Sequence, residues 1–285
     1  MSPVPGVRYG YADTRFGQLH YCTAGDGPPL LCLHQTPRSI DEFRELIPLL
    51  AAHVRVVSMD TPGMGASPPL AAGPSIEGYA DAAVALLDVL GIERASLYGH
   101  HTGGVIAVEV AARYPDRVDH LVLSSTPYVD EESRTRRRDR PPIDQAERTQ
   151  DGSHLTTLWA GRRAFYPPDR PDLLDRYVHD LLAADDPEVG HRAVGHYCME
   201  TSIGQIVAPT LCIGASADPF AFGELEPIRS RITGATSAVV EGGTVALIEA
   251  EAPAVAAMIL EFLGTSHSAA AVGSQHDEAR RTREN

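Results

Sequence analysis

The chain has 285 residues, of which 43% are hydrophobic and 22% are charged, proportions that are typical of a globular protein with a sizeable core. Its formal net charge of -14 argues against nucleic acid or an anionic membrane as a partner. All 24 basic residues are arginine, so lysine chemistry such as Schiff-base formation is excluded.

The first residues lack the apolar segment of a secretory signal, and no apolar run approaches membrane-spanning length. We therefore expect a cytoplasmic protein. None of the four cysteines forms a C-x-x-C pair, and Cys32 and Cys212 lie inside apolar runs. Buried, reduced thiols are the expected state of these two side chains.

Strand-like and helix-like segments alternate through the first half of the chain. Residues 7–23 alternate around a Phe-Gly turn and predict a hairpin. Short apolar runs predict buried strands, and segments with helical spacing lie between them. The predicted strands cover 29–34, 54–60, 95–100 and 118–126, and the predicted helices cover 41–53, 75–90 and 103–115.

This alternation predicts a mostly parallel sheet flanked by helices, because a parallel pair of strands needs a crossover connection. Sites in such sheets form at the carboxyl ends of the strands. His34, Asp60, His101 and residues 124–126 all follow predicted strands. We therefore expect them to share one crevice.

The alternation stops after residue 127. Residues 131–142 are dense in charge and proline and predict an exposed connection, and residues 153–166 and 171–185 have helical spacing. Strand-like runs return at 208–215 and 237–243, followed by a helix over 251–264. The predicted organisation is a core of residues 1–127 and 206–264, a helical cap of residues 128–205, and a disordered tail of residues 265–285.

The sharpest motif is the turn Gly99-His100-His101-Thr102-Gly103, between a predicted strand and a predicted helix. Its frame is that of the G-x-S-x-G nucleophile elbow, in which a strained turn exposes the central side chain at the tip of a strand. Here the central residue is His101, so the frame is present without the usual nucleophile.

Over residues 7–264 the chain resembles the α/β-hydrolase superfamily, in particular the capped epoxide hydrolase, haloperoxidase and methylesterase-like subgroup. The motifs that carry the resemblance are the elbow and four others in the family's order: LLCLHQTPRS, MDTPGMGAS, PTLCIGASADP and VEGGTVALIEAEAP. The resemblance implies an α/β-hydrolase fold whose helical cap is inserted after the sixth strand. It also implies that Asp218 is the acid of the site and that Thr244 stands where the family has histidine.

These departures decide which chemistry is possible. A serine hydrolase needs a hydroxyl nucleophile, an imidazole base and an orienting carboxylate. With His101 at the elbow and Thr244 at the histidine position, only Asp218 remains. The acyl-enzyme route is therefore closed, and so is the route that uses an aspartate nucleophile at the elbow.

We predict that His101 extends into the space vacated near Thr244 and meets Asp218, directly or through that threonine. His101 would then act as a general acid and base, with the N–H groups of Thr102 and Gln35 as an oxyanion hole. The remaining residues expected to contact substrate are His34, Ser125, Trp159 and Tyr197.

The leading hypothesis is an enzyme of secondary metabolism that acts on a small apolar carbonyl- or ester-containing metabolite. Elimination, cyclisation, isomerisation and hydrolysis by activated water all fit. The alternatives are a ligand-binding protein or receptor that has lost its chemistry, and an interaction protein with no pocket. Ser124 and Ser125 are alternative nucleophiles without an evident base.

His100 is expected to be structural, pointing toward the sheet. A metal held by His34, His100 and His101 is not favoured, because no ligand spacing supports it. No nucleotide motif occurs in a suitable context, so no cofactor is implied. A homodimer is left open.

Overall fold

The computed structural model describes residues 4–138 and 140–265. Within them the strands form one eight-stranded sheet in the order β1-β2-β4-β3-β5-β6-β7-β8. The tail predicted to be disordered lies outside the described residues apart from Thr265. The strands are β1 (Arg8–Thr14), β2 (Gly17–Ala24), β3 (Pro29–Leu33), β4 (Arg55–Met59), β5 (Ala95–His100), β6 (Val118–Ser124), β7 (Thr210–Ala215) and β8 (Thr236–Val240).

The sheet is mostly parallel, as predicted. The hairpin of β1 and β2 is antiparallel, and β2 also pairs antiparallel with β4. Every other neighbouring pair, from β4 to β8, is parallel. β3 and β5 lie at the centre of the sheet and are almost completely buried, which explains why they read as continuous apolar runs.

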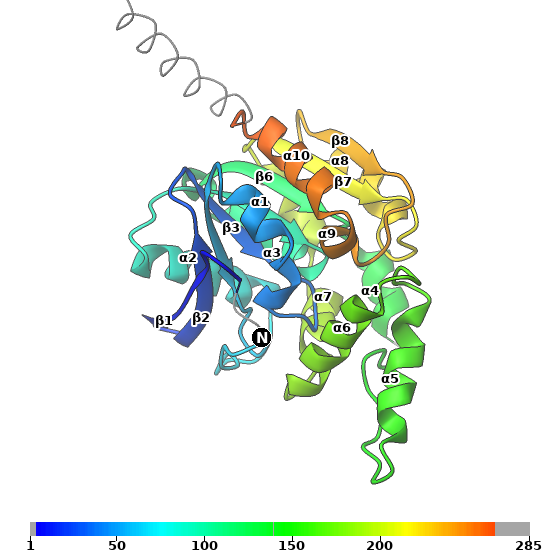
Figure 1. The fold of residues 1–285 in the computed structure, drawn as a ribbon. Helices are drawn as coiled ribbons and strands as arrows, with labels where there is room; N and C mark the ends of the chain where they lie inside the picture. The colour runs from blue at the N-terminus through cyan, green and yellow to red at the C-terminus, as the bar shows by residue number, and fades with distance from the viewer. Residues whose placement is uncertain (1–3, 139, 266–285) are drawn as a thin grey trace, which may run out of the picture.

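Helices cover both faces of this sheet (Figure 1). On one face α1 (Leu46–Leu50) packs against α10 (Ala252–Phe262). On the other, α2 (Ile76–Val89) packs against α3 (Thr102–Arg113). The helix predicted over residues 41–53 is divided, because a 3₁₀ turn (Ile40–Phe43) precedes α1.

The segment between β6 and β7 forms a separate layer of helices, drawn in green beside the sheet in Figure 1. It has a small core of its own, which includes Leu158, Tyr166, Leu173 and Tyr177. The charged stretch predicted to be an exposed connection is in fact largely helical. The helices are α4 (Glu131–Arg138), α5 (Ser153–Arg163), α6 (Pro171–Ala183) and α7 (Val189–His196).

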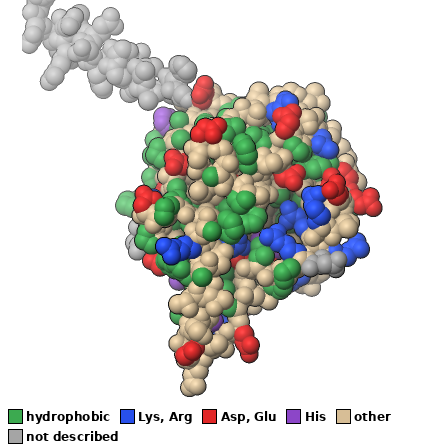
Figure 2. Space-filling model, turned by 90° about the vertical axis from the view of Figure 1, so that its right-hand side faces the viewer, with side chains coloured by type: hydrophobic (Ala, Val, Ile, Leu, Met, Phe, Trp, Pro, Cys, Tyr) green, Lys and Arg blue, Asp and Glu red, His purple; other side chains and the backbone are tan. Residues whose placement is uncertain are grey.

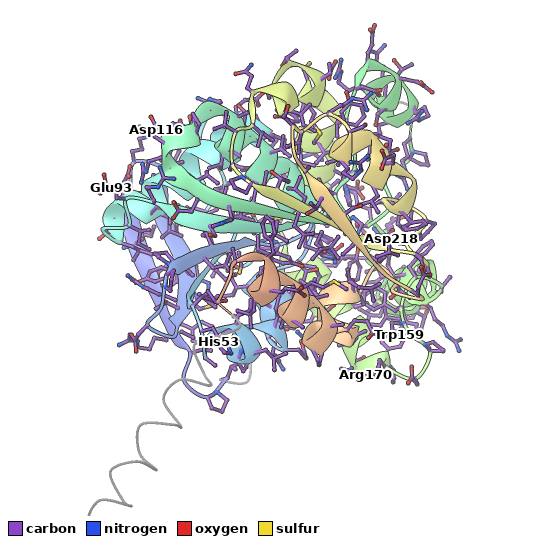
Figure 3. All side chains as sticks on the ribbon, turned by 90° about the horizontal axis from the view of Figure 1, so that it is seen from above. His53, Glu93, Asp116, Trp159, Arg170 and Asp218 are labelled. Carbon is purple, nitrogen blue, oxygen red and sulfur yellow. The ribbon has the colours of Figure 1, made fainter. Side chains whose placement is uncertain are left out.

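The direction of the strands determines where a site can form. Asp218 follows the carboxyl end of β7, whereas Glu93 and Asp116 precede β5 and β6. Figure 3 shows Asp218 on the opposite side of the molecule from those two residues. The carboxyl ends of the parallel strands therefore face the layer formed by α4 to α7.

The helices of the described ranges are all too short or too polar to cross a bilayer.

Candidate active site

The elbow between β5 and α3 is strained at its central residue. His101 has φ 47° and ψ -113°, a backbone conformation that costs a residue other than glycine about 1–3 kcal/mol. The neighbouring glycines permit close packing: a β-carbon on Gly103 would collide with the carbonyl oxygen of Leu33, and one on Gly99 would lie 2.6 Å from the α-carbon of Gly104. This packing holds the His101 side chain at the tip of the strand.

His101 meets Asp218 directly. Nε2 of the ring lies 2.9 Å from Oδ2 of the carboxylate, and the carboxylate side chain is fully buried. The ring N–H does not point along this line, and neither atom has a hydrogen-bond partner within the described residues. The contact is thus a close approach of ring and carboxylate and not an aligned hydrogen bond.

The surroundings of Asp218 favour its charged form. Burial raises the pKa of this carboxyl, but the adjacent His101 ring and the N–H of Phe220, 2.9 Å from Oδ1, outweigh burial and hold the pKa below its usual range. A carboxylate facing Nε2 favours the tautomer with the proton on that nitrogen. Nδ1 makes no hydrogen bond to a described residue and is the nitrogen available to a ligand.

His100, next to the elbow residue, points into the protein as predicted. Its ring is buried and lies 3.2 Å from both the Ser124 hydroxyl and the Val245 carbonyl oxygen. Burial, together with the neighbouring His101, lowers the pKa of His100 to about 3. His100 is therefore a neutral link between β5, β6 and the loop before α9 (Leu247–Ala250).

His34 and Asp60 are also used to hold loops. The His34 ring accepts a hydrogen bond from the Thr61 N–H at 2.9 Å and lies 2.7 Å from the Gln35 carbonyl oxygen, and burial lowers its pKa. Asp60 accepts from the N–H groups of Ile40 and Ala66. We expected both side chains to be available in one crevice with His101. Each is instead already engaged in the hydrogen bonds that hold these loops.

The predicted oxyanion donor at Gln35 is already occupied. Its backbone N–H donates to Glu42 at 2.9 Å, and its side-chain amide donates to the same buried carboxylate. By contrast, the N–H groups of Thr36 and Thr102 donate to no other described residue, and both residues line one cavity with His101. In this structure the pair of donors available to an oxyanion is Thr36 and Thr102.

The other expected site residues lie elsewhere. The Thr244 hydroxyl accepts from the Ala246 N–H at 3.3 Å, just before α9, so it does not bridge His101 and Asp218. Ser125 lines a separate void of about 10 Å³. The Tyr197 hydroxyl donates to Glu109 at 2.7 Å inside the core, and Trp159 packs at the edge of the cap core. Thr244, Ser125, Tyr197 and Trp159 are absent from the described residues that line the His101 cavity.

The His101 cavity has a volume of about 90 Å³ and lies between the sheet and the cap. Its cap side is formed by Arg137, Arg140, Arg162 and His191. Sequence reasoning missed these residues because a run of arginines at the surface and a run that lines a cavity have the same composition. These charged side chains were not anticipated when the sequence led us to expect an apolar metabolite.

A buried ionic cluster holds the loop after β3 against the cap. The Arg38 side chain is fully buried and donates to both carboxylate oxygens of Glu249, at 2.9 and 3.0 Å, and to Asp180 on α6 at 2.9 Å. Three segments far apart in the sequence thus meet at one guanidinium, and the position of Thr36 depends on them.

The donor set is not that of a metal centre. No group of three or more histidine, cysteine, aspartate or glutamate side chains in residues 4–138 and 140–265 is arranged to hold an ion. Cys22, Cys32 and Cys212 are free and buried, and burial raises the pKa of the Cys22 and Cys212 thiols to about 12. The buried thiols are thus poor nucleophiles.

The order of the strands and the sharp turn between β5 and α3 together define a protein with an α/β-hydrolase fold. Comparison with known families agrees with the fold, because residues 28–189 match the family described as the alpha/beta hydrolase fold. The chain belongs to this family.

The similar curated proteins are enzymes with several different activities. The chain is 37% identical to bifunctional epoxide hydrolase 2 of Mus musculus over 138 residues, which are 45% of this chain and 24% of the relative. It is 39% identical to a putative non-heme haloperoxidase of Mycobacterium phage D29 over 102 residues, 35% of this chain and 37% of the relative. The chain thus spans well under half of these relatives.

Solved structures agree over nearly the whole fold. A hydrolase from Pseudomonas aeruginosa PA01 has a TM-score of 0.77 at 23% identity, covering 90% of this chain and 98% of its own. The enol-lactonase from Burkholderia xenovorans LB400 has a TM-score of 0.76 at 22% identity, covering 90% of this chain and all of its own (100%). At such identities the likeness concerns the fold alone.

Proposed function

We propose that this protein is an α/β-hydrolase-fold enzyme that moves a proton on a carbonyl compound without a covalent serine intermediate. His101 is the general base and acid, and Asp218 positions its ring. The observation that carries the proposal is the 2.9 Å approach of Nε2 of His101 to the buried Asp218 carboxylate, at the tip of the elbow strand.

The proposed step is proton abstraction next to a carbonyl group. Nδ1 of His101 takes a proton from the carbon beside the carbonyl, and the electron pair of the C–H bond moves to the carbonyl oxygen as an enolate. The N–H groups of Thr36 and Thr102 would hold that oxyanion. The imidazolium, stabilised by Asp218, then returns the proton to carbon or to a leaving group, which gives isomerisation or elimination. Such a base contributes about 10²–10⁴-fold in rate.

A serine route has little support in the geometry. The Ser124 hydroxyl contacts His100, whose ring is a weak base at its depressed pKa, and Ser125 lies in a different void. Hydrolysis would use the same His101–Asp218 pair. In that reaction Nδ1 of His101 takes a proton from water, and the water oxygen attacks the carbonyl carbon.

The test is hydrogen exchange at carbon. A panel of carbonyl compounds is incubated with the protein in deuterated buffer, and loss of the signal of the proton beside the carbonyl is followed by NMR. We expect exchange or turnover of at least one compound, a fall of about 10²–10⁴-fold in H101F, and a similar fall in D218N. H53Q, on the far side of the molecule in Figure 3, is the matched control and should behave as the wild type. A wild-type rate in H101F would remove His101 from the mechanism.

The competing function is a binding protein that has lost its chemistry. A His101 ring packed against apolar atoms, away from any carboxylate, would favour a binding protein. In the structure the ring faces the Asp218 carboxylate. Tight binding of a panel compound without exchange, and unchanged binding in D218N, would support that function instead.

A further inference from the structure

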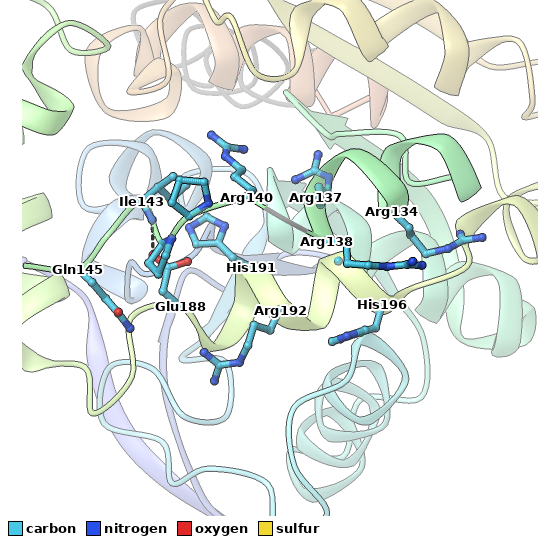
Figure 4. Close-up of a pocket in the computed structure, with 13 residues that line it drawn as sticks. Arg134, Arg137, Arg138, Arg140, Ile143, Gln145, Glu188, His191, Arg192 and His196 are labelled. Carbon is cyan, nitrogen blue, oxygen red and sulfur yellow. Dashed lines mark hydrogen bonds between the residues drawn. The ribbon is translucent and has the colours of Figure 1, made fainter.

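Arginine side chains gather where the cap covers the elbow, although the chain as a whole is acidic. Figure 2 shows basic side chains concentrated on one part of the face drawn there. A cavity of about 510 Å³ lies outside the His101 cavity, and its lining includes Arg134, Arg137, Arg138, Arg140 and Arg192 (Figure 4). The two cavities are adjacent, because both are lined by Arg137, Arg140, Ile143 and His191.

Several of these arginines are neutralised by carboxylates. Arg134 forms a two-pronged pair with Glu200, and Arg192 pairs with Asp186. Arg162, in the inner cavity, forms a two-pronged pair with the buried Asp144, at 2.8 and 2.6 Å. Asp144 also accepts from the Tyr177 hydroxyl and lies 2.9 Å from the His191 ring. Arg162 is therefore a fixed, compensated part of the wall.

Arg137 and Arg140 are different. Neither has an ion pair with a carboxylate of the described residues. Arg137 Nε donates to the Ser133 hydroxyl at 3.2 Å, and the Arg140 guanidinium lies 5.8 Å from the centre of the Phe220 ring. Burial and the nearby Arg140 lower the pKa of Arg137. The carboxylate of Glu224 acts on Arg137 in the opposite direction but forms no ion pair with it. Two like charges thus stand where the two cavities adjoin.

No aspartate or glutamate of the described residues lines the inner cavity, and of its three lining arginines only Arg162 is paired with a described carboxylate, Asp144. Two like charges repel one another, and an anion bound beside them is attracted by both. The planar fork of arginine matches a carboxylate, with which it can form two parallel hydrogen bonds. We propose that Arg137 and Arg140 bind a carboxylate of the substrate and so direct a carboxylate-bearing carbonyl compound to His101. This assignment rests on the proposed function for the reaction at His101, but the anion site stands on its own lining.

The experiment compares matched ligands that differ in one charge. A panel of keto acids of up to about ten heavy atoms, 4-oxopentanoate among them, is tested against the corresponding methyl esters by calorimetry with the full chain. We expect at least one acid to bind about tenfold more tightly than its ester, the ratio that about 1.4 kcal/mol of charge-assisted hydrogen bonding produces. Added salt should reduce the ratio.

Variants locate the effect. In R137Q/R140Q the preference for the acid should disappear, while R136Q, whose arginine pairs with Glu132 outside both linings, should retain it. Calorimetry measures binding without turnover, so a failure of the proposed reaction is distinguishable from a failure of the anion site. The proposal is overturned if no acid in the panel binds more tightly than its ester, or if R137Q/R140Q, folded by circular dichroism, keeps the wild-type ratio.

Discussion

Replacing His101 with phenylalanine should reveal how much of the stability of this protein depends on one buried pair. Phenylalanine retains a ring and the same strained backbone, so the cost of the positive φ is unchanged. What is lost is the partner of a carboxylate whose side chain is fully buried. Asp218 would keep only the Phe220 N–H.

The magnitude follows from that burial. Removing one member of a buried pair costs about 3–5 kcal/mol, because the other charge stays in a poorly solvated place. Removing the charge as well, in H101F/D218N, should return about half of that free energy and leave a loss of about 1–3 kcal/mol, because the buried amide is imperfectly paired. The two substitutions should therefore be coupled by about 2 kcal/mol in a double-mutant cycle.

The effect of pH provides an independent check. In the wild type the pKa of Asp218 is below its usual range, so its contribution is present above the unfolded-state pKa and is lost as pH falls through the lower folded-state pKa. In H101F burial acts without the opposing ring, so the folded-state pKa lies above the unfolded one and the variant gains stability as pH falls. The stability gap between the two proteins should therefore narrow as the pH falls from about 7 to about 4, near the pKa of an aspartate in the unfolded chain.

Urea unfolding followed by far-ultraviolet circular dichroism measures all four proteins of the cycle at both pH values. A variant H101F as stable as the wild type at the higher pH, or a deficit that does not change with pH, would refute the reasoning that Asp218 depends on this ring.

Three further predictions concern the surroundings of the site. E249Q should lower the free energy of unfolding by about 3–5 kcal/mol in urea titration, because Arg38 would keep only one carboxylate partner, Asp180. A variant within about 1 kcal/mol of the wild type would show that the buried Arg38–Glu249 pair does not stabilise the fold. The His100 ring should show no titration shift by NMR between about pH 5 and 8, since its pKa is about 3; a midpoint inside that range would mean that its ring is not held between Ser124 and Val245. G103A should be destabilised by about 1–3 kcal/mol or more, because its β-carbon meets the Leu33 carbonyl oxygen, whereas G161A in α5, with nothing within 4 Å, should be neutral or slightly stabilised in the same titration.

The sequence was sufficient to predict the sheet, the layers and the elbow. Apolar runs of strand length, amphipathic segments between them and glycines around residue 101 are local signals, and each follows from the periodicity of a strand or a helix. The meeting of His101 and Asp218 was accessible as a hypothesis because parallel strands bring their carboxyl ends to one edge of the sheet.

The hydrogen-bond partners of the site residues could not be predicted from the sequence, because they depend on which loops lie against one another. Only the tertiary structure decided that Glu42 occupies the Gln35 N–H, that His34 and Tyr197 serve the packing, and that Thr36 is free to donate. The same holds for Arg137 and Arg140. A charged run has the same composition whether it faces solvent or a cavity, and it is the fold of the segment between β6 and β7 that brings these two residues into the lining of the His101 cavity.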